Sequence, residues 1–418
     1  MELKRVVVTG LGAVTPLGLN VEETWQNLID GKSGCGPVTL IDASKFKTQF
    51  ACEVKGFDPT LYFEKKEVNR VDRYTQFAFA AADEAIKDSG LDLETADKKR
   101  IGVIYSSGIG GIKSFHEESK GYSDERGPRY NPFFIPKIIA DIAAGQLSIK
   151  YGFLGPNFGC VSACASATHG MINAFDLIRL GKADMIVTGG AEAPICEPGL
   201  GGFNAMKALS TRNDDPEHAS RPFSASRDGF VMGEGSGCLI LEELEHAKAR
   251  GAKIYAEVVG GGMSADAYHL TATHPEGLGA KYVMEAALED AGMKPEDIDY
   301  INVHGTSTPV GDRSESKAIK EVFGEAAYKL NISSTKSMTG HLLGAAGAIE
   351  ALFCVKSVQC DIVPPTINHN EDDKDEEIDY NLNFTFNKAQ KRVVRAALSN
   401  TFGFGGHNGS IIVKKYVD

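Results

Sequence analysis

Short runs of β-branched and other apolar residues alternate along the chain with longer stretches of helical periodicity. The runs that predict strands are Arg5–Thr9, Ile101–Tyr105, Met185–Thr188, Ile254–Val259, Tyr300–Val303 and Arg392–Leu398. The clearest helical stretches are Arg73–Ser89, Ser166–Leu180 and Lys281–Ala291. Strands that alternate with helices are typical of an α/β protein with parallel or mixed sheets.

Two segments of the chain repeat the same order of elements. Gly155–Gly190 predicts a strand, a Ser/Cys turn, a helix of small residues and a second strand. Leu330–Pro364 predicts the same order, with a Ser/Thr turn. Cys164 lies at the strand-to-helix turn of the first segment, and His341 lies at that of the second. The repeat indicates two similar halves.

Length supports a division of this kind. The 418 residues exceed the roughly 250–300 at which a single core stops growing. A charged stretch, Glu245–Lys253, lies between the two repeated segments. We therefore expect one half over residues 1–250, which carries Cys164, and a second over residues 251–418.

Composition narrows the classes of protein. With 42% hydrophobic and 24% charged residues the chain reads as an ordinary globular protein, and no long apolar run predicts a membrane span. The first twelve residues lack the features of a signal peptide, and the eight cysteines lack metal-ligand spacing. Reduced thiols and a cytoplasmic location are expected. The net charge of -12 argues against nucleic acid as a partner, and the acidic segment Asn370–Glu377 is expected to be a solvated loop.

Cys164 is the best candidate for a nucleophile. It stands between a predicted strand and a helix of small residues, so the helix N-terminus is expected to lower its pKa and favour the thiolate. A lone cysteine is more often a buried structural residue. The other cysteines have no better context than that.

Two histidine motifs change this balance. His304 follows a strand in Asn302-Val-His-Gly-Thr-Ser-Thr308, and His341 ends Lys336-Ser-Met-Thr-Gly-His341. Strand ends of α/β sheets are where ligand clefts form. A thiol and two histidines at such turns predict a catalytic site, although each alone is more often structural.

At this point the chain resembles a known family. Val161-Ser-Ala-Cys-Ala-Ser166, His304-Gly-Thr-Ser-Thr308, Lys336–His341 and Asn400-Thr-Phe-Gly-Phe-Gly-Gly406 are similar to the signature blocks of bacterial β-ketoacyl synthases. The resemblance covers essentially the whole chain and is closest to the elongating branch, synthase II. It implies a thiolase-like α/β fold of two similar halves, a five-layered α-β-α-β-α sandwich with mixed sheets, and a homodimer.

The resemblance also implies a reaction. An acyl chain is held as a thioester on Cys164, and malonyl-acyl-carrier-protein loses carbon dioxide and attacks it, giving 3-oxoacyl-acyl-carrier-protein in fatty acid elongation. His304 and His341 are expected to stabilise the enolate charge. The backbone N–H groups of Cys164 and Phe402 are expected to form an oxyanion hole.

Further residues receive roles from the same resemblance. Lys336, with Glu350 as its carboxylate partner, is expected to support the two histidines. Thr306 and Thr308 are suited to bind the pantetheine arm of the carrier. The expected gate and acyl-pocket residues are Phe402, Ile109 and Phe203. No cofactor is expected; a structural monovalent cation is expected, if at all, near Asn302, Glu350, Ser399 and Asn400.

The carrier protein of this family's systems is acidic, so an acidic synthase needs a local basic surface to dock it. The expected docking residues are Lys65, Lys66, Arg70, Arg73, Lys207 and Arg212. Scattered solvated charge is the equally weighted alternative. No membrane partner is expected.

Rival interpretations remain within and outside the superfamily. A thiolase needs a second catalytic cysteine, and neither Cys354 nor Cys360 has the following glycine typical of it. The initiating synthase uses asparagine where this chain has His341, and a chain-length factor lacks the nucleophile. A non-enzymatic scaffold is the remaining class. The sequence leaves open the acyl chain length and the choice among synthase II, synthase I and a polyketide-type role.

Overall fold

The computed structural model describes residues 3–121 and 129–417. Within them, ten strands form a mixed sheet in the order β10-β9-β13-β14-β8-β1-β7-β6-β4-β5. The first set comprises β1 (Val6–Val14), β4 (Ile101–Ser106), β5 (Asn157–Phe158), β6 (Met185–Glu192) and β7 (Gly235–Glu243). The second comprises β8 (Ala256–Ala265), β9 (Tyr300–Asn302), β10 (Asn331–Ser333), β13 (Ala396–Gly403) and β14 (His407–Lys414).

The two sets of strands have the same order and the same directions. In the first, β5, β4 and β6 are parallel, and β7 and β1 follow antiparallel. In the second, β10, β9 and β13 are parallel, and β14 and β8 follow antiparallel. The sets join where β1 pairs with β8 over Val6–Val8. The boundary at residue 250 itself stays a prediction.

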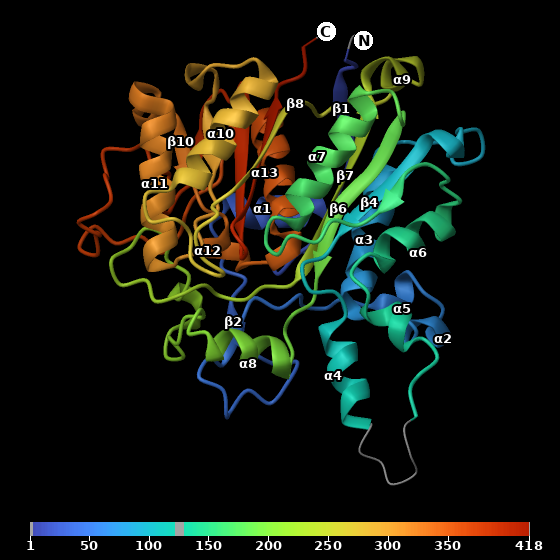
Figure 1. The fold of residues 1–418 in the computed structure, drawn as a ribbon, viewed down its shortest axis with the longest axis horizontal. Helices are drawn as coiled ribbons and strands as arrows, with labels where there is room; N and C mark the ends of the chain where they lie inside the picture. Colours follow the sequence, from blue (N-terminus) through green and yellow to red (C-terminus); the bar gives the residue numbers. More distant parts are fainter. Residues whose placement is uncertain (1–2, 122–128, 418) are drawn as a thin grey trace.

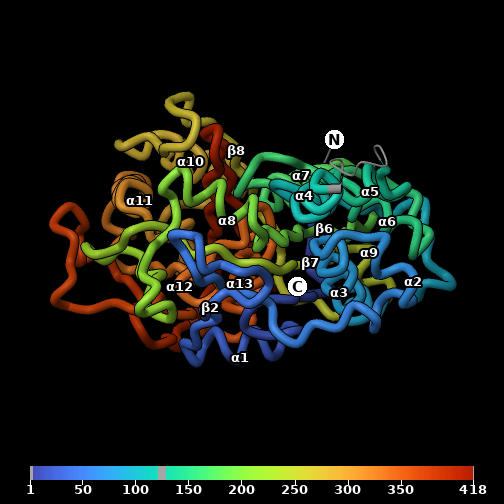
Figure 2. Tube along the Cα trace, turned by 90° about the horizontal axis from the view of Figure 1, so that it is seen from below, coloured from blue at the N-terminus to red at the C-terminus, as the bar shows by residue number. Residues whose placement is uncertain are grey.

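Helices cover both sets of strands and fill the space between them. On the outer face of the first set lie α3 (Arg73–Asp88) and α6 (Ile142–Tyr151), and on that of the second lie α10 (Leu278–Ala291) and α11 (Pro309–Phe323). Between the sets lie α7 (Ser166–Arg179) and α13 (Ala346–Cys360), as Figures 1 and 2 show. The expected α-β-α-β-α layering is therefore confirmed.

The alternation of side chains along each strand explains why helices cover both faces of the sheet. Met185 and Val187 of β6 pack under α3, whereas Ile186 between them faces the central helices. On β13, Leu398 packs toward α10, and Ala397 faces the central layer. Because successive side chains point to opposite faces, a strand that is apolar throughout must be covered on both sides.

The repeat predicted from the sequence needs one correction. The short strand after α13 is β11 (Ile362–Val363), which pairs with β12 (Gln390–Lys391) outside the main sheet. The strand that occupies the place equivalent to β6 is β13, because the chain makes an excursion over residues 364–395 before it returns. For this reason β13 begins at Ala396 rather than at Arg392.

Shorter elements complete the described chain. They are β2 (Gly36–Pro37), β3 (Phe50–Ala51), α1 (Val21–Ile29), α2 (Lys65–Val68), α4 (Ile112–Gly121), α5 (Phe134–Ile138), α8 (Glu197–Ala205), α9 (Leu244–Ala249) and α12 (Lys336–Thr339). In Figure 1, α4, α8 and β2 lie below the strands. Among the described residues one stretch, Leu343–Cys360, has the length and apolarity of a membrane span, but 83% of it is buried inside the protein as the central helix.

Candidate active site

A cavity of about 430 Å³ is lined by residues of both halves. The halves meet there through the turns that follow β5 and β10, and the loops after β4 and β9 complete its wall. The site residues expected from the sequence that line it are Cys164, His304, His341, Ile109, Phe203, Thr306, Thr308, Phe402 and, from the predicted docking set, Lys207. The sequence thus brings residues that are more than a hundred positions apart into one pocket.

The turn that carries Cys164 is strained and internally braced. Ala163 has a φ of 51°, in the left-handed region that an alanine rarely adopts. The Ser166 hydroxyl, at the first position of α7, donates to the Ala163 carbonyl at 2.6 Å and accepts from the Ser162 N–H at 2.9 Å. This turn places the buried Cys164 at the pocket, just ahead of the helix N-terminus.

The thiol and the two histidines are in contact. His341 Nε2 lies 3.0 Å from Cys164 Sγ, and the His304 and His341 rings are 5.3 Å apart and perpendicular. The backbone of His341 is held on both sides: its N–H donates to Val231 at 2.7 Å, and its carbonyl accepts from Gly233 at 2.9 Å. The Nδ1 atoms of both histidines are buried with no hydrogen-bond partner among the described residues. The second half therefore delivers two rings to the thiol of the first.

The protonation states differ from the expectation for Cys164. Burial raises the pKa of its thiol to about 12, although the charge of Lys336 and the N–H of Phe404 both lower it. Desolvation thus outweighs the helix N-terminus, and the prediction of a lowered pKa was wrong. Burial, followed by the charge of Lys336, holds the pKa of His304 and His341 well below the usual value. The resting site holds a neutral thiol beside neutral imidazoles.

Lys336 forms a buried ion pair with Glu350, as the sequence predicted. The Lys336 Nζ donates to Glu350 Oε1, and the two side chains are 1% and 3% exposed. Burial raises the pKa of Glu350 to about 7, while Lys336 lowers it. The pair places a fixed positive charge behind both histidines.

The position of Phe402 corrects one assignment. Its ring is buried and packs 5.5 Å from the His304 ring, in the core beneath α10. The backbone N–H that faces the Cys164 sulfur is that of Phe404, whose half-buried ring contacts Phe203 across the pocket. We therefore assign the second oxyanion donor and the pocket gate to Phe404 in place of Phe402.

The wall around Ile109 depends on a carboxylate that the sequence analysis missed. Glu192, fully buried at the end of β6, accepts from the Gly108 N–H at 2.8 Å, the Ile109 N–H at 3.2 Å and the Gly344 N–H at 2.9 Å. A Cβ on Gly344 would lie 2.1 Å from the Gly108 nitrogen, so the two loops can touch only because residue 344 is glycine. The signal in the sequence was an ionisable residue that closes an apolar strand.

The loop after β9 is held in a similar way. Glu315 of α11 is buried and accepts from the His304 and Gly305 N–H groups, each at 2.9 Å. Beyond them, the hydroxyls of Thr306 and Thr308 lie 3.0 Å apart at the pocket. Two neighbouring hydroxyls at an opening can bind amide groups of an extended arm.

The expected cation neighbourhood contains unsatisfied oxygens. In the part of the chain that the structure describes, Asn302 Oδ1, Glu350 Oε2 and Ser399 Oγ are buried with no hydrogen-bond partner. Asn400 differs, because its side chain bonds Glu315 and Ser410. Hard cations prefer oxygen ligands of this kind, so three of the four residues fit a monovalent cation.

The predicted docking residues divide into two kinds. Lys65, Lys66 and Lys207 are exposed, and Arg70 lies over the Phe133 ring at 4.9 Å. Arg212 bonds the Ser226 carbonyl. Arg73 instead pairs with buried Glu234 at 2.7 Å and is 21% exposed. Its guanidinium is held by the fold, and its place on the docking surface stays a prediction.

Known proteins share this combination of fold and site. Residues 3–247 match the N-terminal domain of β-ketoacyl synthases, and residues 255–370 match their C-terminal domain. The chain is 50% identical over 413 residues to 3-oxoacyl-[acyl-carrier-protein] synthase 2 of Staphylococcus aureus, covering 99% of each chain. A β-ketoacyl synthase of Burkholderia phymatum superposes with a TM-score of 0.91 at 34% identity, covering 99% of this chain and 100% of the other.

A second solved structure adds a different chemistry. A ketosynthase bound to a hexaketide, in complex with its type II polyketide acyl-carrier protein, superposes with a TM-score of 0.90 at 34% identity and full coverage of both chains. The layered α/β fold is therefore thiolase-like, as expected. The chain belongs to the β-ketoacyl synthase family.

Proposed function

We propose that this enzyme condenses malonyl-acyl-carrier-protein with an acyl chain held on Cys164, giving 3-oxoacyl-acyl-carrier-protein and carbon dioxide. The observation that carries the proposal is the contact between Cys164 Sγ and His341 Nε2 at 3.0 Å, with His304 beside it in a cavity open to both halves. The 50% identity to a curated synthase 2 supports the elongating role in fatty acid synthesis.

Acyl transfer uses the thiol. Because burial keeps Cys164 protonated, its proton passes to His341 Nε2 as the sulfur attacks the acyl-carrier thioester. The tetrahedral oxyanion accepts hydrogen bonds from the N–H groups of Cys164 and Phe404. Collapse expels the carrier thiolate, which takes the proton back from His341, and leaves the acyl chain on sulfur.

Decarboxylation uses the histidines as donors. Neither Nδ1 has a hydrogen-bond partner among the residues that the structure describes, so neither ring is fixed in one tautomer, and each can carry its proton at the nitrogen that faces the pocket. Their N–H groups bond the malonyl thioester oxygen as the C–C bond to carbon dioxide breaks and charge gathers there. The enolate carbon then attacks the acyl thioester, and Cys164 leaves as a thiolate, which takes up one proton from solvent.

Carrier protein is the expected partner for both steps. The exposed Lys65, Lys66, Arg70 and Lys207 support docking of an acidic carrier near the pocket. Thr306 and Thr308 would bind the pantetheine arm.

We also infer a homodimer through β5. This two-residue strand is an edge of the sheet, and Leu154, Phe158 and Val161 around it are exposed to 69%, 37% and 61%. An apolar sheet edge in solvent favours pairing with a second copy. Sedimentation of wild type and of Val161→Asp tests this, since the aspartate should shift the enzyme toward monomer.

Two smaller proposals accompany the reaction. A monovalent cation held by Asn302, Glu350 and Ser399 would satisfy their buried oxygens and stabilise the fold, without a chemical role. The eight free cysteines support a reducing, cytoplasmic location.

One assay tests the reaction. Purified enzyme is given malonyl carrier and acyl carriers of short, medium and long chain, and product and acyl-enzyme are followed by mass spectrometry. The expected result is a 3-oxoacyl product and an acyl group mapped to Cys164. Acylation at another residue, or no product with any primer, overturns the proposal; the preferred chain length separates elongating from polyketide-type roles.

A further inference from the structure

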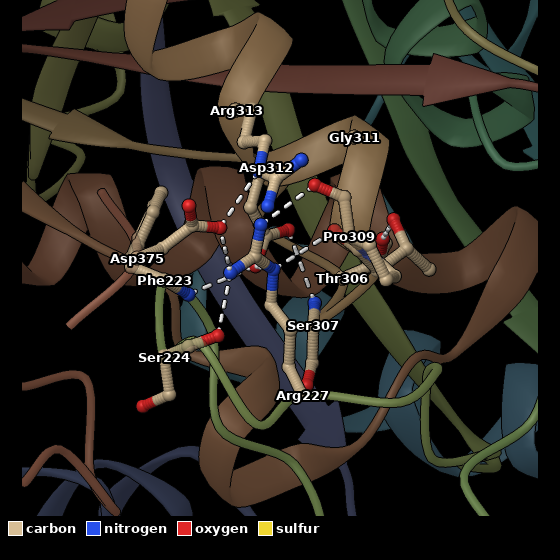
Figure 3. A network of polar contacts seen from close by, with 12 residues as sticks. Phe223, Ser224, Arg227, Thr306, Ser307, Pro309, Gly311, Asp312, Arg313 and Asp375 are labelled. Carbon is tan, nitrogen blue, oxygen red and sulfur yellow. Dashed lines mark hydrogen bonds and ion pairs between the residues drawn. The ribbon is translucent and has the colours of Figure 1, made fainter. Parts of the chain in front are cut away.

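A buried cluster of charges lies directly behind the pocket wall. The Arg227 side chain is 1% exposed and lies between Asp312, at 3.4 Å, and Asp375, at 2.8 Å, as Figure 3 shows. Arg313 also pairs with Asp375, at 2.7 Å. None of these four residues lines the cavity. Burying charged side chains costs free energy, so we expect this cluster to hold a part of the structure in place.

That consequence is visible in the hydrogen bonds to the threonine loop. Arg227 donates to the carbonyls of Thr308 at 3.1 Å and Pro309 at 2.6 Å. Asp312 accepts from the Ser307 N–H at 3.2 Å. The cluster therefore holds both sides of Ser307, the residue between the two threonines, which itself has a φ of 67°.

Asp375 belongs to the acidic segment Asn370–Glu377, which the sequence analysis assigned to solvent. It is 3% exposed, and its neighbour Asp373 accepts from the Ser226 N–H at 2.9 Å. The expectation of a solvated loop was therefore wrong for these two residues. A buried carboxylate is hidden from sequence analysis when it lies within a run of exposed ones.

We propose that Arg227 and Asp375 are positioning residues, which act through the Thr306–Pro309 backbone to hold the two threonine hydroxyls for the pantetheine arm. The proposal rests on the proposed function, because it assigns those hydroxyls to a carrier-bound substrate. Neither residue touches the reacting atoms. The remote acidic segment thereby sets the affinity for the arm.

Guanidinium geometry makes the role specific to arginine. Arg227 bonds two successive backbone carbonyls and two carboxylates from one plane. A lysine at the same position keeps the charge but presents a single point donor, so it cannot hold both carbonyls at once. Loosened carbonyls let the threonine hydroxyls move away from the arm.

The test uses Arg227→Lys and Asp375→Asn in the full-length enzyme, with malonyl carrier and malonyl-pantetheine as separate substrates. Each variant should raise KM about five- to tenfold for both substrates, with kcat within twofold of wild type. Equal effects on both substrates are expected because the loop contacts the arm and not the carrier. Iodoacetamide labelling of Cys164 should be unchanged.

Arg250→Lys is the matched control, because Arg250 pairs with buried Glu242 at 2.6 Å and neither residue lines the cavity. It should lower the melting temperature without changing KM. An unchanged KM in both Arg227→Lys and Asp375→Asn, or an equal rise in KM in Arg250→Lys, would overturn the positioning role. If wild type itself fails to condense, the proposed function fails instead.

Discussion

The loops after β4 and β9 occupy equivalent places in the two halves, and each is held by a buried glutamate that accepts successive backbone N–H groups. In the first half Glu192 holds Gly108 and Ile109, and in the second Glu315 holds His304 and Gly305. Both halves therefore hold the equivalent loop by the same kind of contact. The loops nevertheless present different chemistry, since one is apolar and the other carries a histidine and hydroxyls.

The two clamps also differ in what else they hold. Glu315 lies on α11 and takes a third bond from Asn400 of its own half. Glu192 lies on β6 and reaches Gly344, three residues after His341, in the other half. The Glu192 clamp therefore links the loop of Ile109 to the segment that follows His341 in the other half. The Glu315 clamp makes its contacts within the second half.

The variant with the largest expected effect should separate acyl transfer from decarboxylation. Cys164→Ala removes the nucleophile of the first half, so condensation should fall by at least about 10⁴-fold. Decarboxylation of malonyl carrier needs the histidines of the second half, and it should stay within about tenfold of wild type. Carbon dioxide release and 3-oxoacyl product are measured in parallel. Equal loss of both would show that the halves do not divide the reaction in this way.

The reciprocal change is His304→Ala. It removes one donor to the developing enolate, so decarboxylation should fall about 10²- to 10³-fold. Acylation of Cys164 should change by less than about tenfold, because His341 Nε2 is the group in contact with the sulfur. Rapid-quench measurement of acyl-enzyme checks this. An equal loss of acylation and decarboxylation would show that His304 takes part in acyl transfer as well.

The two clamps can be compared by their pH dependence. Burial raises the pKa of both Glu192 and Glu315 to about 7, against an ordinary value of 4.5. A raised folded-state pKa means that the folded protein binds more protons between these values, so stability falls as pH rises through that window. Relative to Glu192→Gln or Glu315→Gln, the wild-type free energy of unfolding should fall by about 3 kcal/mol between pH 4.5 and 7.

Chemical denaturation at steps of half a pH unit measures these differences. Glu94→Gln, at an exposed surface position, controls for the effect of the substitution itself. If the difference from wild type were flat with pH for only one of the two variants, the glutamate replaced in that variant would not have a raised pKa. The two loops would then not be held in the same way.

The sequence predicted the elements and the catalytic trio more reliably than their supports. Strand and helix periods were clear because β6 begins with the apolar run Met185–Val187 and α7 buries an apolar face that includes Met171 and Phe175, and Cys164 and His341 stood at turns with a repeated order. The pKa of Cys164 depends on burial, which no local pattern reveals. Phe402 and Phe404 stand two residues apart in one motif, so only the packing of their rings and amides distinguishes them.

The residues that were missed share a physical reason. Glu192 and Arg227 act through backbone groups of loops distant in sequence, at separations of 84 residues for Glu192 and Gly108 and 81 for Arg227 and Thr308. Glu315 lies only 11 residues after His304, but the irregular turn into α11 that brings its carboxylate back to the loop follows no periodic spacing. Spacing along the chain carries no information about such pairs. A buried ionisable residue in an apolar context is the signal that remains.

The smallest expected effect tests where the carrier meets the two halves. Reversing charge at exposed Lys66 and at Arg70 of the first half should raise KM for malonyl carrier about five- to tenfold at low salt, and the effect should shrink as salt screens it. KM for malonyl-pantetheine should not change, because that substrate lacks the acidic carrier. Lys182→Glu is the control, since Lys182 is exposed at the opposite end of β6 from Glu192. If both substrates were weakened equally, Lys66 and Arg70 would act on the arm rather than the carrier, and docking would fall to the other predicted residues, such as Lys207.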